Sequence, residues 1–422
     1  MIKENYLERL LDGVSIEWKP LESVIVSLKT GLNPRKNFKL NTLDSVGFYV
    51  TVREIQNGKI VFVDKTDRVN DEALKLINNR SNLEIGDVLF SGTGTIGRIA
   101  VIENAPVNWN IKEGVYSIKP IKGAINSRYL AHLLNSNNII KKYSTKIVGS
   151  PVSSLPMGKL RKLEIPIPCP NNQKKSLEIQ QEIVRILDNL TELTTELTTE
   201  LTAELTAREK QYKYYRDKLI INSTSTTEKL KDIADIYLGL TYTPTYVESG
   251  VKFISAKNTS QDYLNLEDVK YISEEEYEKS TSNAKPKRGD VLFTRVGSNL
   301  GHPVIVDTDE KLCMFVSLGY IRVDSSKVLN SYIKHWMNTD LFWNQVRKNT
   351  YGAAKINLNT GWLKKFDVVL PNLTEQQRIV SILDKFEALT TSITEGLPHE
   401  IELRQKQYEY YRDMLLSFPK GE

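Results

Sequence analysis

The sequence predicts an α+β protein in which two α/β domains are separated by two long antiparallel coiled-coil helices, as a pseudo-two-fold internal repeat. Residues 180–219 and 376–415 both open with QQxIVxILD and close with KQYxYYRD, at one constant offset without a gap. The strand motif GDVLF also occurs twice, at residues 86–90 and 289–293. Segments that have the same motifs at both ends and the same length are copies of one structural element. The predicted order along the chain is therefore domain, helix, domain, helix.

The first long helix is expected over residues 173–221, which contain no Gly or Pro. At 1.5 Å per residue it reaches roughly 70 Å, which is typical of a coiled-coil rod. Its apolar residues recur at three- and four-residue steps along one face: Ile183, Leu187, Leu190, Leu193, Leu197, Leu201 and Leu205. The natural partner of this stripe is the other copy, which chain reversal makes antiparallel. Gly396 and Pro398 predict a break or kink in that second copy.

The two domains show β-rich runs separated by turns. In the first domain, strands are predicted at residues 47–52, 59–63, 87–90, 98–102, 114–118 and 163–167, and a helix at 127–135. The same skeleton recurs in the second domain, where His335 takes the place of His132, while the loops differ. The expected boundaries are 1–172 for an N-terminal helix (1–13) and first domain, 173–222 for the first long helix, 223–372 for the second domain, and 373–422 for the second helix and tail.

Composition restricts the class of protein. The formal net charge is +5, and the excess is concentrated in residues 14–170, at about +9, against about +1 in residues 225–372. A nucleic acid partner and simple solvation of lysines both account for this excess. Cys169 and Cys313 are too few for a disulfide framework or structural zinc site, which favours a cytoplasmic location. No apolar run is long enough to span a bilayer, so no membrane partner is expected.

Together, the paired QQxIVxILD and KQYxYYRD blocks, the paired GDVLF strands and the Glu-Leu-Thr tract resemble the specificity subunit of a Type I restriction–modification system. The resemblance covers nearly the whole chain. It implies two target-recognition domains that each read half of a bipartite, asymmetric site in double-stranded DNA. It also implies helices that dock two methyltransferase subunits, with restriction subunits completing the complex. The chain itself would be non-catalytic and hold no cofactor, because S-adenosylmethionine, ATP and Mg²⁺ would belong to the partners of this adenine methyltransferase and ATP-dependent endonuclease.

The tract at residues 192–207 consists of four Glu-Leu-Thr-Thr/Ala units. One unit advances a helix by about 6 Å and turns it about 40° beyond a full turn, close to the twist of one base pair. As a four-residue stutter, it also locally unwinds a coiled coil. We hypothesise that the number of units sets the unread gap between the two half-sites. The alternative is a solvated helix whose repeats have no consequence.

The candidate DNA contacts are basic, hydroxyl, amide and tyrosine side chains in predicted loops. Arg and Lys match guanine, and Asn matches adenine, while hydroxyls suit phosphates; turns that only face water are the alternative. In the first domain the candidates are Asn33, Arg35, Lys36, Arg53, Thr93, Thr95, Arg98, Ser150, Ser153 and Ser154. In the second they are Tyr242, Thr243, Lys257, Asn258, Arg295, Ser298, Asn299, Lys355, Asn357 and Asn359. Spacer or subunit-docking residues are Leu193, Leu197, Leu201, Leu205, Tyr212, Tyr215, Tyr408 and Tyr411.

Other chemistry is sparse in the sequence. Gly92–Gly97 fits the dinucleotide fingerprint G-x-G-x-x-G, but residues 98–102 read as a strand where that motif needs a helix, so a hairpin turn is expected. The four histidines show no metal-ligand spacing with the cysteines, so no metal site is predicted, and His132 and His335 suit packing. Three alternatives remain: a coiled-coil adaptor with two protein-binding domains, a nucleotide-cofactor enzyme using the Gly92 loop, and the specificity subunit of a related methyltransferase-only or Type IIB-like system.

Overall fold

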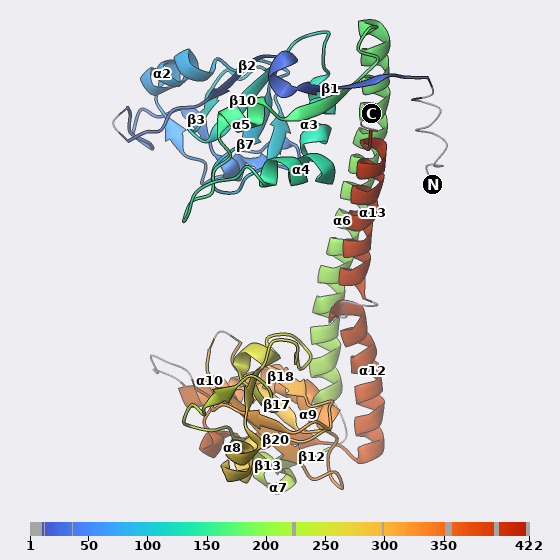
Figure 1. The fold of residues 1–422 in the computed structure, drawn as a ribbon. Helices are drawn as coiled ribbons and strands as arrows, with labels where there is room; N and C mark the ends of the chain where they lie inside the picture. Colours follow the sequence, from blue (N-terminus) through green and yellow to red (C-terminus); the bar gives the residue numbers. More distant parts are fainter. Residues whose placement is uncertain are drawn as a thin grey trace. The chain divides into compact units, whose positions relative to one another are not determined.

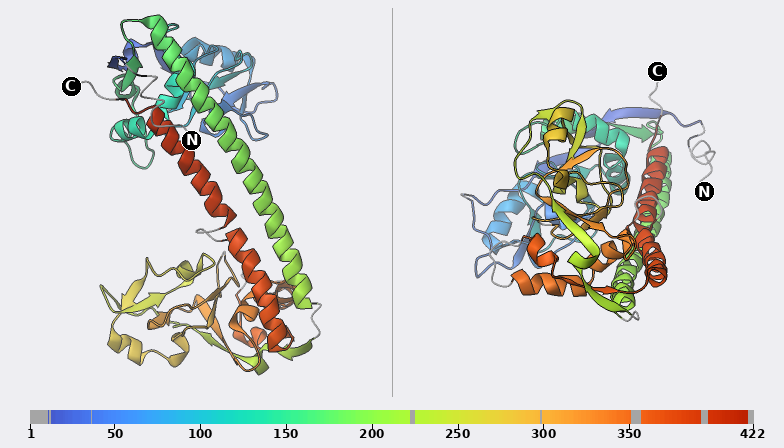
Figure 2. Two further views of the ribbon diagram at one scale, coloured as in Figure 1. Left: turned by 90° about the vertical axis from the view of Figure 1, so that its right-hand side faces the viewer. Right: turned by 90° about the horizontal axis from the view of Figure 1, so that it is seen from below.

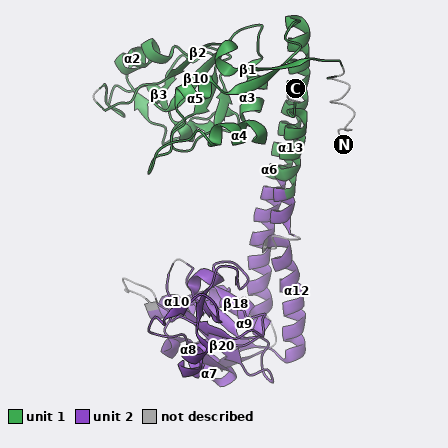
Figure 3. Ribbon diagram, in the orientation of Figure 1, with its two compact units in different colours: residues 1–198, 403–422 green, residues 199–402 purple. Residues whose placement is uncertain are grey.

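The computed structural model describes residues 11, 13–35, 37–221, 225–297, 299–350, 357–391 and 396–418. Figure 3 shows its two compact units: unit 1 comprises residues 1–198 and 403–422, and unit 2 comprises residues 199–402. The boundaries between the units fall inside helix α6 (Gln173–Ile221) and inside helix α13 (Leu397–Leu415). Each unit therefore contains one mixed domain and parts of two long helices. The helix predicted at residues 1–13 lies almost wholly outside the described residues.

Unit 1 is built on a four-stranded antiparallel sheet with the strand order β2-β10-β7-β8 (Figure 1). These strands are β2 (Ile25–Thr30), β10 (Val115–Pro120), β7 (Val88–Ser91) and β8 (Ile99–Val101). The smaller sheets are formed by β1 (Ile16–Pro20) with β11 (Glu164–Pro168), by β6 (Arg68–Val69), β3 (Gly47–Val50) and β9 (Trp109–Ile111), and by β4 (Ile55–Gln56) with β5 (Lys59–Ile60). The helices are α2 (Asp71–Ser81), α3 (Ser127–Leu134), α4 (Asn137–Ser144) and α5 (Met157–Arg161). Helix α3 packs on β7 and β8, so the main core lies between this sheet and the helices.

Unit 2 repeats this topology with the order β13-β20-β17-β18. These strands are β13 (Ala234–Leu238), β20 (Leu318–Val323), β17 (Val291–Thr294) and β18 (Pro303–Ile305). The other sheets pair β12 (Thr226–Lys229) with β21 (Asp367–Leu370) and join β14 (Tyr246–Val247), β16 (Lys270–Ile272), β15 (Val251–Ile254) and β19 (Leu312–Met314). The helices are α7 (Leu230–Ile233), α8 (Glu274–Lys279), α9 (Asn330–Met337), α10 (Asp340–Thr350), α11 (Thr360–Leu363) and α12 (Leu373–Thr391). The predicted α+β class and internal repeat are confirmed.

Most of the predicted strands in the first domain are present. Strands β3, β7, β8, β10 and β11 and helix α3 fall within or overlap the predicted segments. The strand predicted at 59–63 was too long, because β5 ends at Ile60, and the partly exposed ring of Phe62 stacks on Phe48 of β3 instead of continuing the strand. Helix α2 was missed. The sequence does contain a signal for its start, because Asn is a preferred N-cap residue. In the structure Asn70 is the N-cap of α2, and its side chain accepts a hydrogen bond from the Ala73 nitrogen.

The long helices follow the predicted pattern. Helix α6 runs uninterrupted for 49 residues, whereas the second copy is divided into α12, which ends at Thr391, and α13, which begins at Leu397. This confirms the predicted break. Gly396 directly precedes α13, and Pro398 lies in its first turn, where a missing N–H is tolerated because no intrahelical partner exists there.

Within each unit the two helical segments are antiparallel (Figures 1 and 2). In unit 1, Ile183 and Leu187 of α6 share a core with Leu415, and Thr191 further along α6 hydrogen-bonds Tyr408 at 3.1 Å. In unit 2, Ile220 shares a core with Ile379, while Tyr212 and Tyr215 meet Phe386. In both units, the opening block of one copy therefore packs against the closing block of the other.

The apolar stripe of α6 is buried over only part of its length. Leu187 packs with Leu415 of the other copy, the expected partner of the stripe, whereas Leu193 and Leu197 are exposed. A strict four-residue spacing rotates successive leucines by about 40°, which moves them off a straight helix–helix seam. The threonines of the tract remain compatible with a helix because their hydroxyls bond carbonyls four residues back, as Thr195 does to Thr191.

Candidate nucleic-acid interface

In unit 1, loops that are far apart in the sequence are hydrogen-bonded into one surface. The Gly94 nitrogen donates to the Ser153 carbonyl at 2.9 Å, and the Leu155 nitrogen donates to the Gly92 carbonyl at 2.8 Å. The hydroxyls of Thr93 and Ser154 lie 3.3 Å apart. Two of the predicted contact loops, 91–98 and 149–154, are thus one structural feature. Its polar side chains project from a frame that main-chain bonds hold in place.

A third predicted loop joins this surface at the end of β2. The Thr30 hydroxyl accepts a hydrogen bond from the Gly114 nitrogen at 3.0 Å and donates to the Val115 carbonyl at 3.1 Å. Gly31 allows the close approach, because a Cβ there would lie 1.7 Å from the Ile111 carbonyl oxygen. Asn33 and the exposed Arg35 follow directly. Lys36 lies outside the described residues.

Unit 2 builds the same frame with different side chains. The Leu358 nitrogen donates to the Arg295 carbonyl at 3.1 Å, and the Arg295 nitrogen donates to the Ser317 carbonyl at 2.8 Å. These bonds match those that Gly92 makes with Leu155 and Gly114. Asn299 reaches from the same loop to the Thr259 carbonyl at 3.4 Å. Ser298 and Lys355, which we predicted as contacts, lie outside the described residues.

Several predicted basic contacts are exposed but already paired. Arg53 forms an ion pair with Asp67 at 2.9 Å, and Lys257 forms one with Asp268. The hydrogen bond and charge of Lys257 lower the pKa of Asp268. Surface pairs of this kind contribute little to stability, so a phosphate can replace the carboxylate at small cost. Arg98 is also exposed, and one of its terminal nitrogens donates to the Val52 carbonyl at 3.0 Å.

Other predicted contacts differ in how their side chains are used. Asn258 is buried, with its amide nitrogen on the Asn265 carbonyl and its oxygen on the Ser255 nitrogen, so it braces its own loop. Asn359 is the N-cap of α11. Thr95, Ser150 and Thr243 are exposed, Ser153 and Asn357 are half-buried, and Tyr242 is exposed beside a shallow pocket of about 370 Å³.

A buried glutamine joins each domain to the long helix that follows it. Gln180 accepts a hydrogen bond from the Asn126 nitrogen at 2.8 Å, and Gln376 accepts one from the Leu329 nitrogen at 2.9 Å. Both side chains are fully buried and also donate to main-chain carbonyls in front of α3 and α9. The QQ pair of the repeat is therefore a docking element, a role that the sequence analysis did not assign.

A histidine–aspartate pair forms the second junction in each unit. His132 Nε2 lies 2.9 Å from an Asp188 oxygen, and His335 Nε2 lies 2.7 Å from an Asp384 oxygen. Burial opposes ionisation of Asp188, but the bonds from His132 and Arg128 outweigh it and lower the pKa of Asp188. The predicted packing role of the two histidines is consistent with these contacts. The sequence signal for these two pairs was the aspartate that ends the ILD motif in both repeats, together with the equivalent positions of the two histidines.

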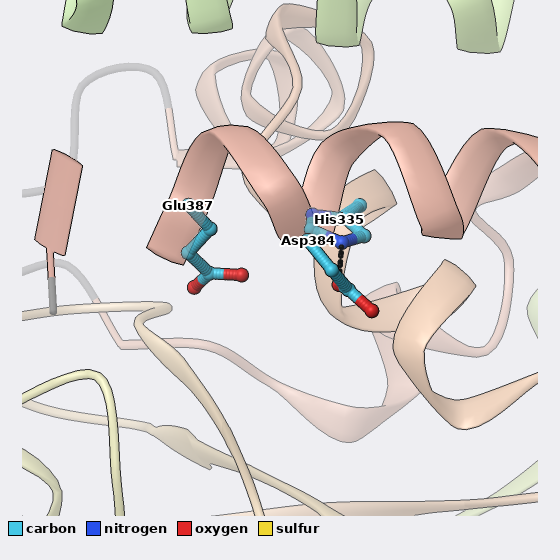
Figure 4. A group of neighbouring side chains, drawn as sticks. All are labelled: His335, Asp384 and Glu387. Atoms are coloured by element: carbon cyan, nitrogen blue, oxygen red, sulfur yellow. Dashed lines mark hydrogen bonds and ion pairs between the residues drawn. The ribbon is translucent and has the colours of Figure 1, made fainter. Parts of the chain in front are cut away.

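In unit 2 the junction also brings Glu387 close to His335 and Asp384, and Figure 4 shows the three side chains together. Their ligand atoms lie within 4.8 Å of one another, a spacing that a metal ion could bridge. However, the other ring nitrogen of His335 lies 3.1 Å from the Tyr212 hydroxyl, and Glu387 binds Lys334 at 2.6 Å. All three groups are therefore already engaged as parts of a helix junction.

The closing blocks place their tyrosines on two sides of each helix. Tyr212 and Tyr408 face the neighbouring helix of their unit, whereas Tyr214 and Tyr410 are 58% and 61% exposed. Tyr215 and Tyr411 lie between these positions, and each makes an edge contact with the exposed ring beside it. The exposed pair occupies equivalent positions of the repeat, which the predicted list of docking residues did not include.

The Gly92 loop connects β7 to β8 as an antiparallel hairpin, so Ile99–Val101 is a strand as predicted. The loop thus does not lead into the helix that a dinucleotide-binding fingerprint needs to bind a pyrophosphate. Across the described part of the chain, no helix is both long and apolar enough to cross a membrane.

Comparison with known proteins agrees with this architecture. The domain family described as the Type I restriction modification DNA specificity domain matches residues 35–207 and again residues 222–403. The fold thus belongs to a class of duplicated specificity-domain proteins. The chain is a member of the Type I restriction–modification specificity subunit family.

Individual relatives cover the full length. The chain is 32% identical to the EcoR124I/EcoR124II Type I restriction enzyme specificity subunit of Escherichia coli, over 100% of this chain and 99% of that one. A Haemophilus influenzae relative is 34% identical over 98% of both chains. A solved chain from a study of complex assembly in the type I R-M system superposes with a TM-score of 0.67, at 17% identity, over 95% of this chain and 97% of that one. This last likeness concerns the fold alone.

Proposed function

We propose that this chain is a non-catalytic DNA-specificity subunit whose two mixed domains each read half of a bipartite, asymmetric site. The recognition domains would lie within residues 1–172 and 223–372. The observation that supports this most directly is the shared loop frame: Gly92 and Arg295 make equivalent main-chain bonds, while the side chains around them differ. A common frame that carries unlike side chains is suited to reading two different sequences.

The exposed and half-buried polar groups on and around this frame determine what it would bind. In unit 1 we assign contacts to Arg35, Arg53, Thr93, Arg98 and Ser153, which combine guanidinium groups with hydroxyls. In unit 2 the contacts we assign are Tyr242, Thr243, Lys257, Arg295, Asn299 and Asn357. Phosphate contacts would orient each unit, and guanidinium or amide contacts in the major groove would select bases.

A two-stage experiment tests this function. The chain, reconstituted with its methyltransferase subunits, is first titrated with duplex DNA at several salt concentrations. We expect affinity to fall linearly with the logarithm of salt, since phosphate neutralisation releases counterions. Methylated adenines are then mapped by sequencing after modification of genomic DNA. A bipartite motif with a constant gap supports the proposal, whereas salt-independent binding or modification without a motif contradicts it.

We further propose that the helical segments dock two methyltransferase subunits, which would supply S-adenosylmethionine chemistry. Restriction subunits would add ATP- and Mg²⁺-dependent cleavage. Tyr214 and Tyr410 support this because they are large, exposed and equivalent in the repeat, so one partner type could use both. The variant Tyr214→Ala/Tyr410→Ala should lose methyltransferase binding in a co-purification assay. Substitution of Tyr263, another exposed tyrosine, to Ala is the control, and it should leave assembly intact.

A further inference from the structure

A tyrosine and a glycine in unit 1 are fitted to each other at the centre of the loop frame. A Cβ atom on Gly92 would lie 2.1 Å from a ring carbon of Tyr116, so only glycine leaves room for the ring. The Tyr116 hydroxyl donates a 2.7 Å hydrogen bond to the Leu155 carbonyl. Leu155 ends the 149–154 loop, and its nitrogen is bound by Gly92. The loop end is therefore held on both sides of one residue.

In unit 2 the large and the small residue at these two positions are exchanged. Strand register places Gly319 opposite Phe293 as Tyr116 is opposite Phe90, so Gly319 occupies the position of Tyr116. Arg295 occupies the position of Gly92. Its Nε donates a 3.3 Å hydrogen bond to the Leu358 carbonyl, the counterpart of the carbonyl that Tyr116 binds. Each unit thus has one glycine and one side-chain donor at this pair of positions, but the donor lies in β10 in unit 1 and directly after β17 in unit 2. In unit 2 a Cβ on Gly319 would meet the ring of Phe293, at 2.4 Å.

We infer that Tyr116 and Arg295 are equivalent positioning residues that hold the second contact loop of each unit in its reading geometry. This inference rests on the proposed DNA-reading function. Without the side-chain donor, the leucine carbonyl loses this partner, and the leucine itself keeps the main-chain bond through its nitrogen. A shift of about 1 Å in such a loop is enough to misplace groups that must meet base edges.

Tyr116 and Arg295 differ in the hydrogen-bond donors that they leave for DNA. Tyr116 is buried and uses its single hydroxyl inside the protein. Arg295 is half-buried, and a guanidinium has five N–H donors, of which Nε–H is used by Leu358. Among the described residues, no carboxylate pairs with Arg295. Unit 2 therefore retains donors at this position for a phosphate or a guanine, and unit 1 does not.

The test uses the reconstituted methyltransferase complex and measures selectivity at each half-site by sequencing methylated adenines. Tyr116→Phe should lower selectivity at the half-site read by unit 1 by about threefold to tenfold, the scale of one hydrogen bond, and leave the other half unchanged. The matched control is Tyr129→Phe, which removes another buried hydroxyl-to-carbonyl bond in unit 1, at 3.1 Å to Pro166, away from the loops. It should lower thermal stability without altering selectivity.

A compensating exchange makes the test decisive. Gly92→Arg alone should impair the unit 1 half-site because of the clash with Tyr116, and Tyr116→Gly alone should impair it by loss of the donor. The double variant, which reproduces the unit 2 arrangement, should recover selectivity above either single variant. Recovery supports the inference. A double variant no better than the worse single variant, or equal selectivity changes in Tyr116→Phe and Tyr129→Phe, overturns it. If the unaltered complex modifies DNA without any motif, the DNA-reading function itself fails.

Discussion

The side-chain oxygen of Gln180 accepts a hydrogen bond from the main-chain nitrogen of Asn126 at 2.8 Å, in a fully buried position. This one contact ties the loop in front of α3 to the start of the long helix. Gln376 repeats it with Leu329 in unit 2. The orientation of each domain on its own helix is therefore set partly by a single amide, since its carbonyl and its NH₂ both bind the domain.

Replacing Gln180 by Ala should destabilise unit 1 by about 1–3 kcal/mol, because the half-buried Asn126 nitrogen and Ala124 carbonyl lose their partner. The neighbouring Gln181 is exposed, so Gln181→Ala is a matched control with little expected effect. Urea denaturation of the purified chain measures both. Equal midpoints for the two variants would show that the amide contact is dispensable.

The His132–Asp188 pair predicts a pH dependence of stability. The pKa of Asp188 is lowered in the folded chain, so the stabilisation is present above the unfolded value of about 4 and is lost as pH falls through the folded pKa. Asp188→Asn removes this titration. We expect the wild type to be more stable than the variant near pH 7 and the difference to shrink as the pH falls below about 4.

Thermal unfolding of the wild type and of Asp188→Asn, measured from pH 7 to below pH 4, tests this prediction. Glu192→Gln, which changes an exposed carboxyl on the same helix, is the control and should follow the wild type. A wild type that keeps its full advantage over Asp188→Asn in acid would contradict the role assigned to the carboxylate.

Deleting residues 196–199, one Glu-Leu-Thr-Thr unit, should shorten the unread gap between half-sites by one base pair. The reason is that the twist removed, about 40°, matches roughly one base-pair step. The control keeps the length and replaces Thr198 and Thr199 by Ala, which preserves helix propensity. Mapping methylated adenines reports the gap in each variant. An unchanged gap after deletion, or a changed gap in the control, would end the hypothesis that unit number is a ruler.

Replacing residues 225–372 by the corresponding domain of a relative should alter one half of the target and leave the other half unchanged. This follows because residues 225–372 lie wholly within unit 2, whereas the loops assigned to the other half-site belong to unit 1. Sequencing of the modified motif distinguishes the outcomes. Changes in both halves would show that the two domains do not read independently.

Much of the fold could be predicted from local pattern. The GDVLF runs become β7 and β17, as expected of short continuous apolar runs that follow a glycine turn and end in buried strands. The break before α13 follows from Gly396 and Pro398, whose backbone preferences act locally. Strand β5 was overextended since Val61, Phe62 and Val63 have β-forming side chains, whereas after the bond of the Val61 nitrogen to the Glu54 carbonyl the Val63 nitrogen bonds the Thr66 side chain instead of a strand.

The candidate site was predictable only as separate loops. That Thr93 and Ser154 lie side by side depends on strand order and on the path of α4 and α5, which no local spacing encodes. Likewise, Asn258 is a residue type suited to reading adenine, but its burial and its three main-chain hydrogen bonds become visible only in three dimensions.

By itself, the sequence determined that two like parts alternate with two like helices, since repeats, strand motifs and helix breakers are properties of short segments. Only the tertiary structure decided which residues of the paired helices are buried, and that Tyr116 in β10 and Arg295 after β17 bind equivalent leucine carbonyls. The physical reason is that burial and hydrogen-bond satisfaction are settled by groups distant along the chain, and these meet only once the sheets and helices have packed.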